Sequence, residues 1–355
     1  MSSPIIVACI LVSAPIFPPQ LADIPVNGEC ESFAKPFDAV MIDYLVKTKA
    51  PGGALSIFYK GKKVYSKGFG LANVEEKRAF TPTTPTRISS LSKHLTQRAI
   101  KILIQQGKIS LETKAVDILA QEGIVPLVKQ GNLVDSRLGK ITVGQLLEHK
   151  SGIRAGLDIS QCTSDEVIRL MGFKTPISPQ DALGYVLGLP LESDPGTTTN
   201  YSNFGYSLLG KIVQIVSGKP YEEFVRTNVL FPKVDPNSWF VTSAQRKDKR
   251  REEAEYYSSI STPTWDAFRW DILAGAGGWV ASVEGIAEFF SKEFPGSGWD
   301  YTLFGSYTGA VTVMKVHKNS LTFAASINYR RGNNASDNDI LFKNLEQVSS
   351  GLSLP

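Results

Sequence analysis

The most informative stretch of this 355-residue sequence runs from Arg87 to Lys93 and reads Arg-Ile-Ser-Ser-Leu-Ser-Lys. An extended segment passes into a helix here, so Ser90 and Lys93 lie three positions apart on one helical face. A neutral lysine in a dry cleft can take the proton of a serine hydroxyl and make that serine a nucleophile. The spacing alone is a weak signal, because Ser32-Phe33-Ala34-Lys35 repeats it elsewhere in the chain.

A second polar group follows about a hundred residues later, where Pro195-Gly196 precedes Tyr201-Ser202-Asn203. A tyrosine beside the serine and lysine can pass a proton to a leaving group. The amide of Asn203 can orient the lysine and hold a substrate carbonyl. The alternative is a core tyrosine at the entry of a helix, with Asn203 as the helix cap.

Composition excludes several classes of function. The chain has 38 basic and 34 acidic residues, a net charge of +4, and no run of like charge, so a nucleic-acid-binding face is not expected. Its three cysteines and three histidines lack the short spacings that hold a metal, and we predict no metal site. With 42% hydrophobic residues, the chain can build a core large enough for an enzyme cleft.

The first residues resemble an export signal. The apolar run from Ile5 to Phe17 is too short for the ~20 residues of a membrane-spanning helix, so no stable membrane span is expected. We predict a signal-peptide-like leader over residues 1–22 and a secreted or exported protein. Cys30 and Cys162 then remain, and they can either pair or stay as two buried thiols.

Hydrophobic periodicity places strands at both ends of the chain and helices in its centre. Alternation predicts two hairpins, 54–59 with 63–69 and 309–317 with 321–329. Helical spacing predicts helices over 33–49, 87–107, 203–217 and 337–348, and the mixed charges of 246–255 suggest a solvated segment. This order implies one sheet assembled from both chain ends, with a helical lobe from the centre and a cleft between them.

Several motifs together resemble the serine β-lactamase and penicillin-binding-protein superfamily, closest to its class C β-lactamase and family VIII esterase branch. They occur in the family's order and cover about residues 33 to 348. They are Arg87–Lys93, Ile141–Val143, Leu146–Gly152, Pro195–Gly196, Tyr201–Tyr206 and Gly277–Trp279.

The resemblance implies an α+β fold of the β-lactamase/transpeptidase-like type, with an antiparallel sheet flanked by helices and an all-helical lobe. The domain would span 23–355, with a sheet lobe over about 33–85 and 265–348 and a helical lobe over about 86–264. It also implies an acyl-serine intermediate without metal or cofactor. Ser90 would be the nucleophile, Lys93 the general base or its partner, Tyr201 the second proton carrier, and Asn203 the orienting amide.

The family's third motif, Lys-Thr-Gly or His-Thr-Gly, is matched here to Tyr307-Thr308-Gly309. Lys150-Ser151-Gly152 is excluded because it precedes Tyr201. The match makes the N–H groups of Ser90 and Ala310 the oxyanion hole, with Gly309 allowing close approach of the substrate.

Replacing the family's cation by Tyr307 weakens attraction for a substrate carboxylate, because a hydrogen bond to a charged group contributes about 1.5–3 kcal/mol. Two alternatives stay open. Arg330 or Arg331 can restore the charge, or Tyr307 is a packing residue on its strand.

The other candidate residues have structural alternatives. The acyl pocket is lined by Trp265, Trp270 and Trp279, or these tryptophans belong to the core. His94, His149 and His317 are assigned structural places.

These observations predict a serine hydrolase of esterase or acyltransferase type that acts on a small, neutral ester or amide. One alternative is a β-lactamase or D-amino-acid peptidase. The other is a catalytically inactive binding or assembly module of the same fold.

Overall fold

The structure is a computed structural model, and it describes residues 24–128, 133–154, 168–169, 171–174, 177–243, 245–259, 269–296, 298–332, 336–352 and 354. The predicted leader, Cys162 and Trp265 lie outside these residues, so export and a Cys30–Cys162 disulfide stay predictions. Within the described ranges, no helix has the length and apolar character needed to cross a bilayer.

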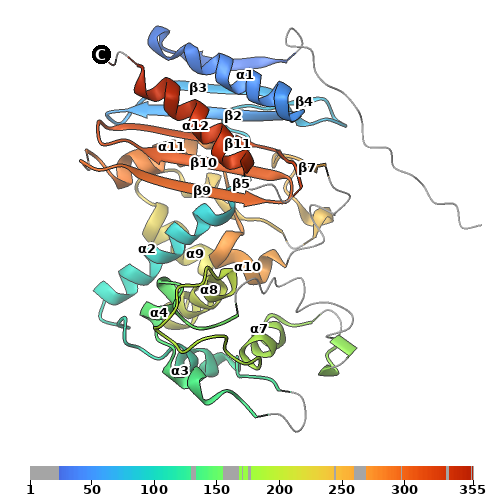
Figure 1. Cartoon of the computed structure of the whole chain (residues 1–355), viewed down its shortest axis with the longest axis vertical. Coiled ribbons are helices and arrows are strands. Elements are labelled where there is room, and N and C mark those ends of the chain that lie inside the picture. The colour runs from blue at the N-terminus through green and yellow to red at the C-terminus, as the bar shows by residue number, and fades with distance from the viewer. Residues whose placement is uncertain are drawn as a thin grey trace, which may run out of the picture.

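A seven-stranded antiparallel sheet organises the described part of the chain (Figure 1). Its strand order is β1-β3-β2-β11-β10-β9, and β4 pairs with β3. The strands are β1 (Val26–Cys30), β2 (Gly52–Tyr59), β3 (Lys62–Asn73), β4 (Arg78–Ala79), β9 (Tyr301–Tyr307), β10 (Ala310–Val316) and β11 (Leu321–Ile327). Because β2 pairs with β11, the start and the end of the chain meet in the middle of the sheet.

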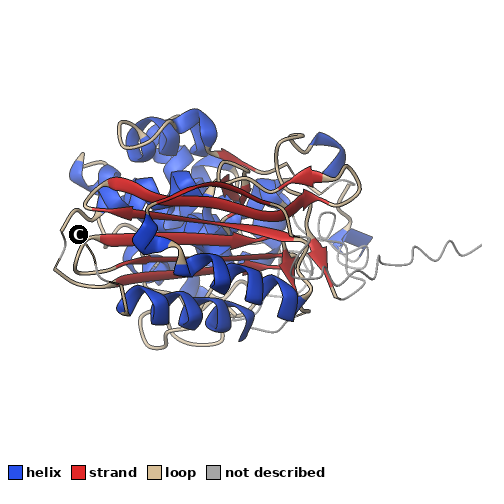
Figure 2. Cartoon of the chain, turned by 90° about the horizontal axis from the view of Figure 1, so that it is seen from above, coloured by secondary structure: helices blue, strands red, loops and turns tan. Residues whose placement is uncertain are grey.

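Both faces of the sheet are covered, which explains why β2, β10 and β11 are buried along nearly their whole length. In β2, Leu55 and Ile57 pack in one core with α1 (Pro36–Thr48) and α12 (Ser336–Ser350). Figure 2 shows these two helices across one face. Ala54 and Phe58 point the other way, into the core shared with α11 (Val283–Glu293) and the helical lobe.

The helical lobe lies below the sheet in Figure 1 and is built around α8. Its helices are α2 (Ser92–Gln105), α3 (Ala115–Leu119), α4 (Val143–Leu147), α7 (Pro179–Leu187), α8 (Asn203–Ser217), α9 (Tyr221–Val225) and α10 (Trp270–Gly277). α8 and α10 touch backbone to backbone, because a Cβ on Gly210 would lie 3.2 Å from the Gly275 Cα. The α+β prediction, a sheet from both chain ends with a helical lobe from the centre, is confirmed.

Short strands join the two lobes. β5 (Thr86–Arg87) pairs with β8 (Trp279–Ala281), which also pairs with β6 (Phe240–Val241). β7 (Tyr257–Ser258) pairs in parallel with β12 (Tyr329–Arg330).

Two details differ from the sequence prediction. The sheet extends beyond the predicted hairpins to the edge strands β1 and β9, whose partial burial leaves no regular alternation of apolar residues. The segment 246–255 is not solvated throughout, since Glu253 is fully buried. Its carboxylate accepts hydrogen bonds from the hydroxyls of Thr242 and Tyr256, which allows a charged residue to enter the core.

Candidate active site

Ser90 lies in a tight turn between β5 and α2. The turn is a 3-10 helix, Ser89–Leu91, held on both sides by β8: the Ile88 N–H donates to the Trp279 carbonyl (2.9 Å), and the Trp279 N–H donates to Ser92 Oγ (3.2 Å). Ser89 is fully buried with φ +49°, a conformation that non-glycine residues rarely adopt. The fold therefore holds a strained backbone directly before the predicted nucleophile.

The Lys93 side chain is buried, with 6% of the residue exposed, and makes three polar contacts. Its Nζ lies 3.2 Å from Ser90 Oγ, 2.8 Å from Asn203 Oδ1 and 2.8 Å from the Ala276 carbonyl oxygen. Burial penalises the ammonium and lowers the pKa of Lys93 to about 7. A substantial share of neutral amine is therefore present at neutral pH.

Tyr201 brings a phenol to the same serine. Its hydroxyl lies 2.6 Å from Ser90 Oγ, and Lys93 Nζ lies 4.7 Å from the centre of its ring. Partial desolvation raises the pKa of Tyr201 above its usual value, although the bond to Ser90 opposes the rise. The phenol thus stays protonated at neutral pH and can donate a proton.

The start of α8 explains how Asn203 reaches Lys93. Ser202 is the helix cap, since its Oγ accepts a hydrogen bond from the Gly205 N–H at 2.9 Å. The alternative with Asn203 as cap is therefore wrong, and the Asn203 amide is available to Lys93. The structure brings all four predicted catalytic residues, Ser90, Lys93, Tyr201 and Asn203, into one group.

The edge strand β9 meets the serine turn at Gly305. A Cβ on this glycine would lie 2.3 Å from the Ile88 carbonyl oxygen and 3.1 Å from the Ser89 Cβ. Only a glycine allows so close an approach of the two backbones. If Gly305 is the glycine of the Lys-Thr-Gly-like triplet, the first residue of that triplet is Leu303.

The pairing of β9 with β10 also indicates which backbone N–H groups of β9 point away from β10. Tyr307 pairs with Ala310 across a two-residue loop, so this pair is hydrogen-bonded, and the next pair, Ser306 with Val311, is not. In a non-hydrogen-bonded pair, the N–H points away from the partner strand. The Ser306 N–H accordingly points to the open edge of the sheet, next to the residue that meets the serine turn, Gly305.

The predicted substrate residues 307–310 are placed differently from Gly305. Tyr307 packs edge-on against Trp270, with ring centres 4.9 Å apart, in agreement with its packing alternative. Thr308 and Gly309 form the hairpin loop, where φ +79° at Gly309 requires a glycine. Ala310 is 1% exposed and packs on Tyr256. Because Ala310 forms the hydrogen-bonded pair with Tyr307, its N–H is directed at β9.

The basic residues considered as substitutes for the missing cation lie elsewhere. Arg331 is bound to Asp337, with Nη2 to Oδ1 at 2.6 Å. Arg330 interacts with Asp337 and with Tyr44 of the core under α1 and α12, which is the opposite face of the sheet. Trp270 and Trp279 are fully buried core residues.

Sequence reasoning missed two groups of this site. The Ala276 carbonyl accepts a hydrogen bond from Lys93, and a backbone oxygen has no residue signature, although Gly277-Gly278-Trp279 marks the place. His149 was assigned a purely structural turn, yet its ring stacks on Tyr201 with ring centres 4.8 Å apart. The Leu-Leu-x-His-x-Ser-Gly motif contained that signal.

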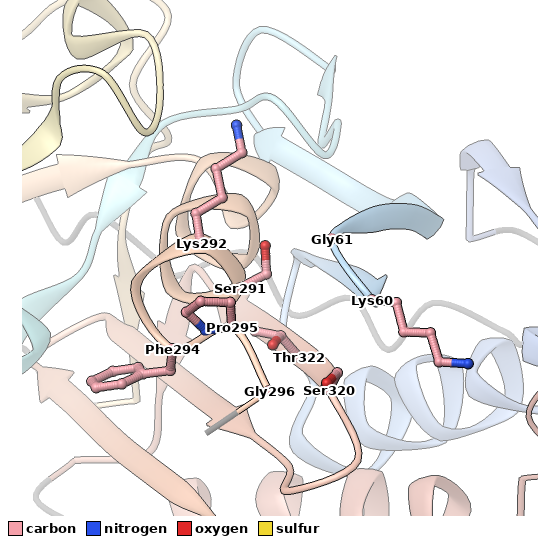
Figure 3. A pocket seen from close by; sticks show the side chains of 9 residues that line it. All are labelled: Lys60, Gly61, Ser291, Lys292, Phe294, Pro295, Gly296, Ser320 and Thr322. Carbon is pink, nitrogen blue, oxygen red and sulfur yellow. The ribbon is translucent and has the colours of Figure 1, made fainter. Parts of the chain in front are cut away.

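A hollow of about 410 Å³ opens elsewhere, lined by the turn after β2, the end of α11 and the start of β11 (Figure 3). Its two lysines point in different directions: Lys292 donates to the Lys233 carbonyl and Glu288, and the Lys60 ammonium lies over the Tyr59 ring. None of the four predicted catalytic residues lines this hollow. Among the described residues, no group of three or more His, Cys, Asp or Glu side chains could hold a metal ion.

Comparison with known proteins identifies the family. The family model described as Beta-lactamase matches residues 37–319. Protein flp of Staphylococcus aureus (strain MW2) is 30% identical over 195 residues, which are 55% of this chain and 36% of flp. Penicillin-binding protein 4 of Amycolatopsis lactamdurans is 23% identical over 243 residues, 68% of this chain and 57% of that protein. The matched part thus spans well under two thirds of both relatives.

Solved structures show the same fold. D-amino acid amidase from Ochrobactrum anthropi SV3, complexed with D-phenylalanine, superposes with a TM-score of 0.69 at 16% identity, covering 90% of this chain and 98% of the amidase. EstCE1, described as a hydrolase with promiscuous acyltransferase activity, gives a TM-score of 0.66 at 16% identity, covering 88% and 97% of the two chains. At these identities the likeness concerns the fold alone.

Proposed function

We propose that this chain, which belongs to the beta-lactamase family of serine hydrolases, cleaves a small, neutral ester or amide through an acyl-serine intermediate on Ser90. The observation that carries the proposal is the set of contacts around Lys93 Nζ. Ser90 Oγ, Asn203 Oδ1 and the Ala276 carbonyl oxygen surround this nitrogen at 2.8–3.2 Å.

The contacts of Lys93 suit a general base. A neutral amine has two N–H donors and one lone pair. Asn203 Oδ1 and the Ala276 carbonyl can only accept, so they take the two N–H groups. The lone pair is left for the third contact, where the Ser90 hydroxyl donates. The amine is thus oriented before the substrate arrives.

The proton path follows from these positions. As Ser90 Oγ attacks the substrate carbonyl carbon, the hydroxyl proton passes to Lys93 Nζ. The carbonyl oxygen becomes an oxyanion, for which we propose the N–H groups of Ser90 and Ser306 as hydrogen-bond donors. When the carbonyl re-forms, the bond to the leaving group breaks and Tyr201 gives that group its proton. Lys93 then returns a proton to Tyr201 across the position that the Ser90 hydroxyl proton had occupied. Water then attacks the acyl carbon, and the same proton path runs backwards. Tyr201 passes its proton to Lys93 and takes one from the water, and Lys93 protonates Ser90 Oγ as the acid product leaves.

The preference for neutral substrates rests on the cleft strand. The sequence of β9, Tyr-Thr-Leu-Phe-Gly-Ser-Tyr, contains no basic residue, whether Leu303 or Tyr307 occupies the family's cation position. A substrate carboxylate would therefore lose a charged hydrogen bond, which contributes about 1.5–3 kcal/mol. This favours esters and amides over β-lactams and D-amino-acid peptides.

We also propose that the protein is exported, and this proposal rests on the apolar leader alone.

The test is covalent labelling of Ser90. The purified protein is incubated with a fluorophosphonate, and intact mass and peptide mapping locate the adduct. We expect one adduct on Ser90, its loss in Ser90→Ala, and its retention in Ser32→Ala, the serine of the second Ser-x-x-Lys segment. An unmodified wild-type protein would support the inactive module instead.

A second measurement compares substrates. The kcat/KM for a neutral p-nitrophenyl ester is expected to exceed that for a chromogenic cephalosporin. Faster turnover of the anionic cephalosporin would contradict the neutral preference and support the β-lactamase alternative, while leaving the acyl-serine chemistry intact.

A further inference from the structure

His149 holds the chain on both sides of Tyr201. Its Nδ1 accepts a hydrogen bond from the Ser202 N–H at 3.0 Å, and its carbonyl oxygen accepts one from the Asn200 N–H at 2.8 Å. The ring stacks on Tyr201, with centres 4.8 Å apart and planes inclined by 29°. One residue thus contacts the ring of Tyr201 and both of its backbone neighbours.

The other side of this contact is anchored in the core. The His149 ring also lies 5.0 Å from the ring of Tyr206, which is fully buried. The Tyr206 hydroxyl donates to the Leu147 carbonyl at 3.0 Å and accepts from Gln97 at 2.6 Å. His149 itself has φ +58°, so its backbone is held in an unusual conformation. These contacts leave the imidazole little freedom to move.

Tyr201 needs such support because it is the exposed member of the catalytic group. The residue is 53% exposed, whereas Lys93 is 6% exposed. A half-exposed tyrosine would otherwise sample several side-chain rotamers, most of which carry the hydroxyl away from Ser90. The 2.6 Å contact between Tyr201 and Ser90 requires one rotamer.

We propose that His149 is a positioning residue for leaving-group protonation: it fixes the Tyr201 phenol against Ser90, so that poor leaving groups receive their proton in time. The inference rests on the proposed function. It assigns His149 no contact with the substrate and no proton transfer of its own. Its effect is therefore confined to steps in which Tyr201 acts.

The arrangement requires a neutral imidazole. Nδ1 must be unprotonated to accept from Ser202, so the ring proton of the neutral form is on Nε2. The titratable groups facing the ring are Lys93 from α2 and Tyr201 and Tyr206 at the start of α8. Burial, and secondly the charge of Lys93, lower the pKa of His149 to about 4. The ring thus remains an acceptor over the pH range in which Lys93 changes charge.

The test varies the leaving group while the acyl group is constant. The p-nitrophenolate of a p-nitrophenyl ester leaves without a proton, whereas the alkoxide of an alkyl ester must be protonated as it leaves. His149→Asn keeps an acceptor and tolerates the positive φ, but it removes the ring. We expect kcat/KM, which reports the acylation step, to fall about 10²-fold for the alkyl ester and to change by less than about threefold for the p-nitrophenyl ester. The loss should vanish in a Tyr201→Phe background, because His149 then has no hydroxyl to position.

Two further variants make the test decisive. His149→Phe keeps a ring but leaves the Ser202 N–H without its acceptor. This variant replaces His149→Asn if the latter does not fold, and we expect it to show the same dependence on the leaving group. His94→Asn is the control: His94 follows Lys93 in α2, is 6% exposed, and contacts Tyr301 and Phe290 rather than Tyr201, so both esters should respond alike.

Equal losses on both esters in the His149 variants, or no loss on either, would overturn the positioning role. Failure of the proposed function is recognised separately, because wild-type Ser90 would then form no fluorophosphonate adduct.

Discussion

The chain contains two Ser-x-x-Lys segments, and their surroundings differ completely. Ser32 and Lys35 lie in the short turn before α1, and both are exposed to solvent. Ser90 is partly exposed, and Lys93 is buried at the junction of the two lobes, within reach of Asn203 and the Ala276 carbonyl. Three-residue spacing places a hydroxyl and an amine on one side of a helical turn in both cases. Burial and contacts with a second chain segment occur only at Ser90 and Lys93, which is why we propose this pair alone as the reactive one.

The largest expected effect comes from removing the amine in each segment. Lys93→Met should lower kcat/KM for a neutral ester by about 10³–10⁴-fold, because general-base catalysis is lost. Lys35→Met should leave kcat/KM unchanged within error. Both are measured at pH 8, with melting curves as the folding control. Equal activity of the two variants would abolish the distinction between the segments.

The pH profile sharpens the same contrast. Burial disfavours the charged amine and lowers the pKa of Lys93 to about 7, so the neutral base is populated above that pH. We expect kcat/KM to fall about tenfold per pH unit below pH 7 and to be level above it until Tyr201, whose pKa is raised, loses its proton. An inflection near the ordinary lysine pKa of about 10.4 would show that Lys93 is not desolvated as described.

The contact between β9 and the serine turn gives a smaller effect, on stability. A Cβ in Gly305→Ala would lie 2.3 Å from the Ile88 carbonyl oxygen, which is a backbone atom and cannot rotate away as a side chain could. We expect the free energy of unfolding to fall by about 1–3 kcal/mol, together with slower fluorophosphonate labelling of Ser90. Gly139→Ala is the control, since nothing lies within 4 Å of its Cβ position. Urea titration measures both variants, and an unchanged midpoint for Gly305→Ala would remove Gly305 from the site.

The smallest effect concerns the cation position on β9. Leu303→Lys should lower KM for a carboxylated ester about tenfold relative to its neutral analogue, since Leu303 lies two residues before Gly305 on the same face of the strand. Tyr307→Lys, at the position matched by sequence, should do less because the Tyr307 ring packs on Trp270. A larger gain in Tyr307→Lys would restore the original match.

The reactive group was more predictable than the strand opposite it. The four residues lie in short motifs whose residue types have few alternative uses together. In the structure, hydrogen bonds link Ser90 with Tyr201, and Lys93 with Ser90 and with Asn203. The strand was harder because glycines occur at both 305 and 309. One glycine allows close packing and the other serves the hairpin loop, and letters alone do not distinguish these uses.

The sequence by itself determined the central strands and main helices, the sheet built from both chain ends, and the residue types that can form and hold an acyl-serine. These properties follow from local periodicity and from short motifs. Tertiary structure alone decided that Lys93 is dry enough to be a base, that Gly305 meets the serine turn, and that His149 stacks on Tyr201. Desolvation and contacts between distant segments depend on what packs around a residue, and a linear sequence does not show which residues are neighbours in space.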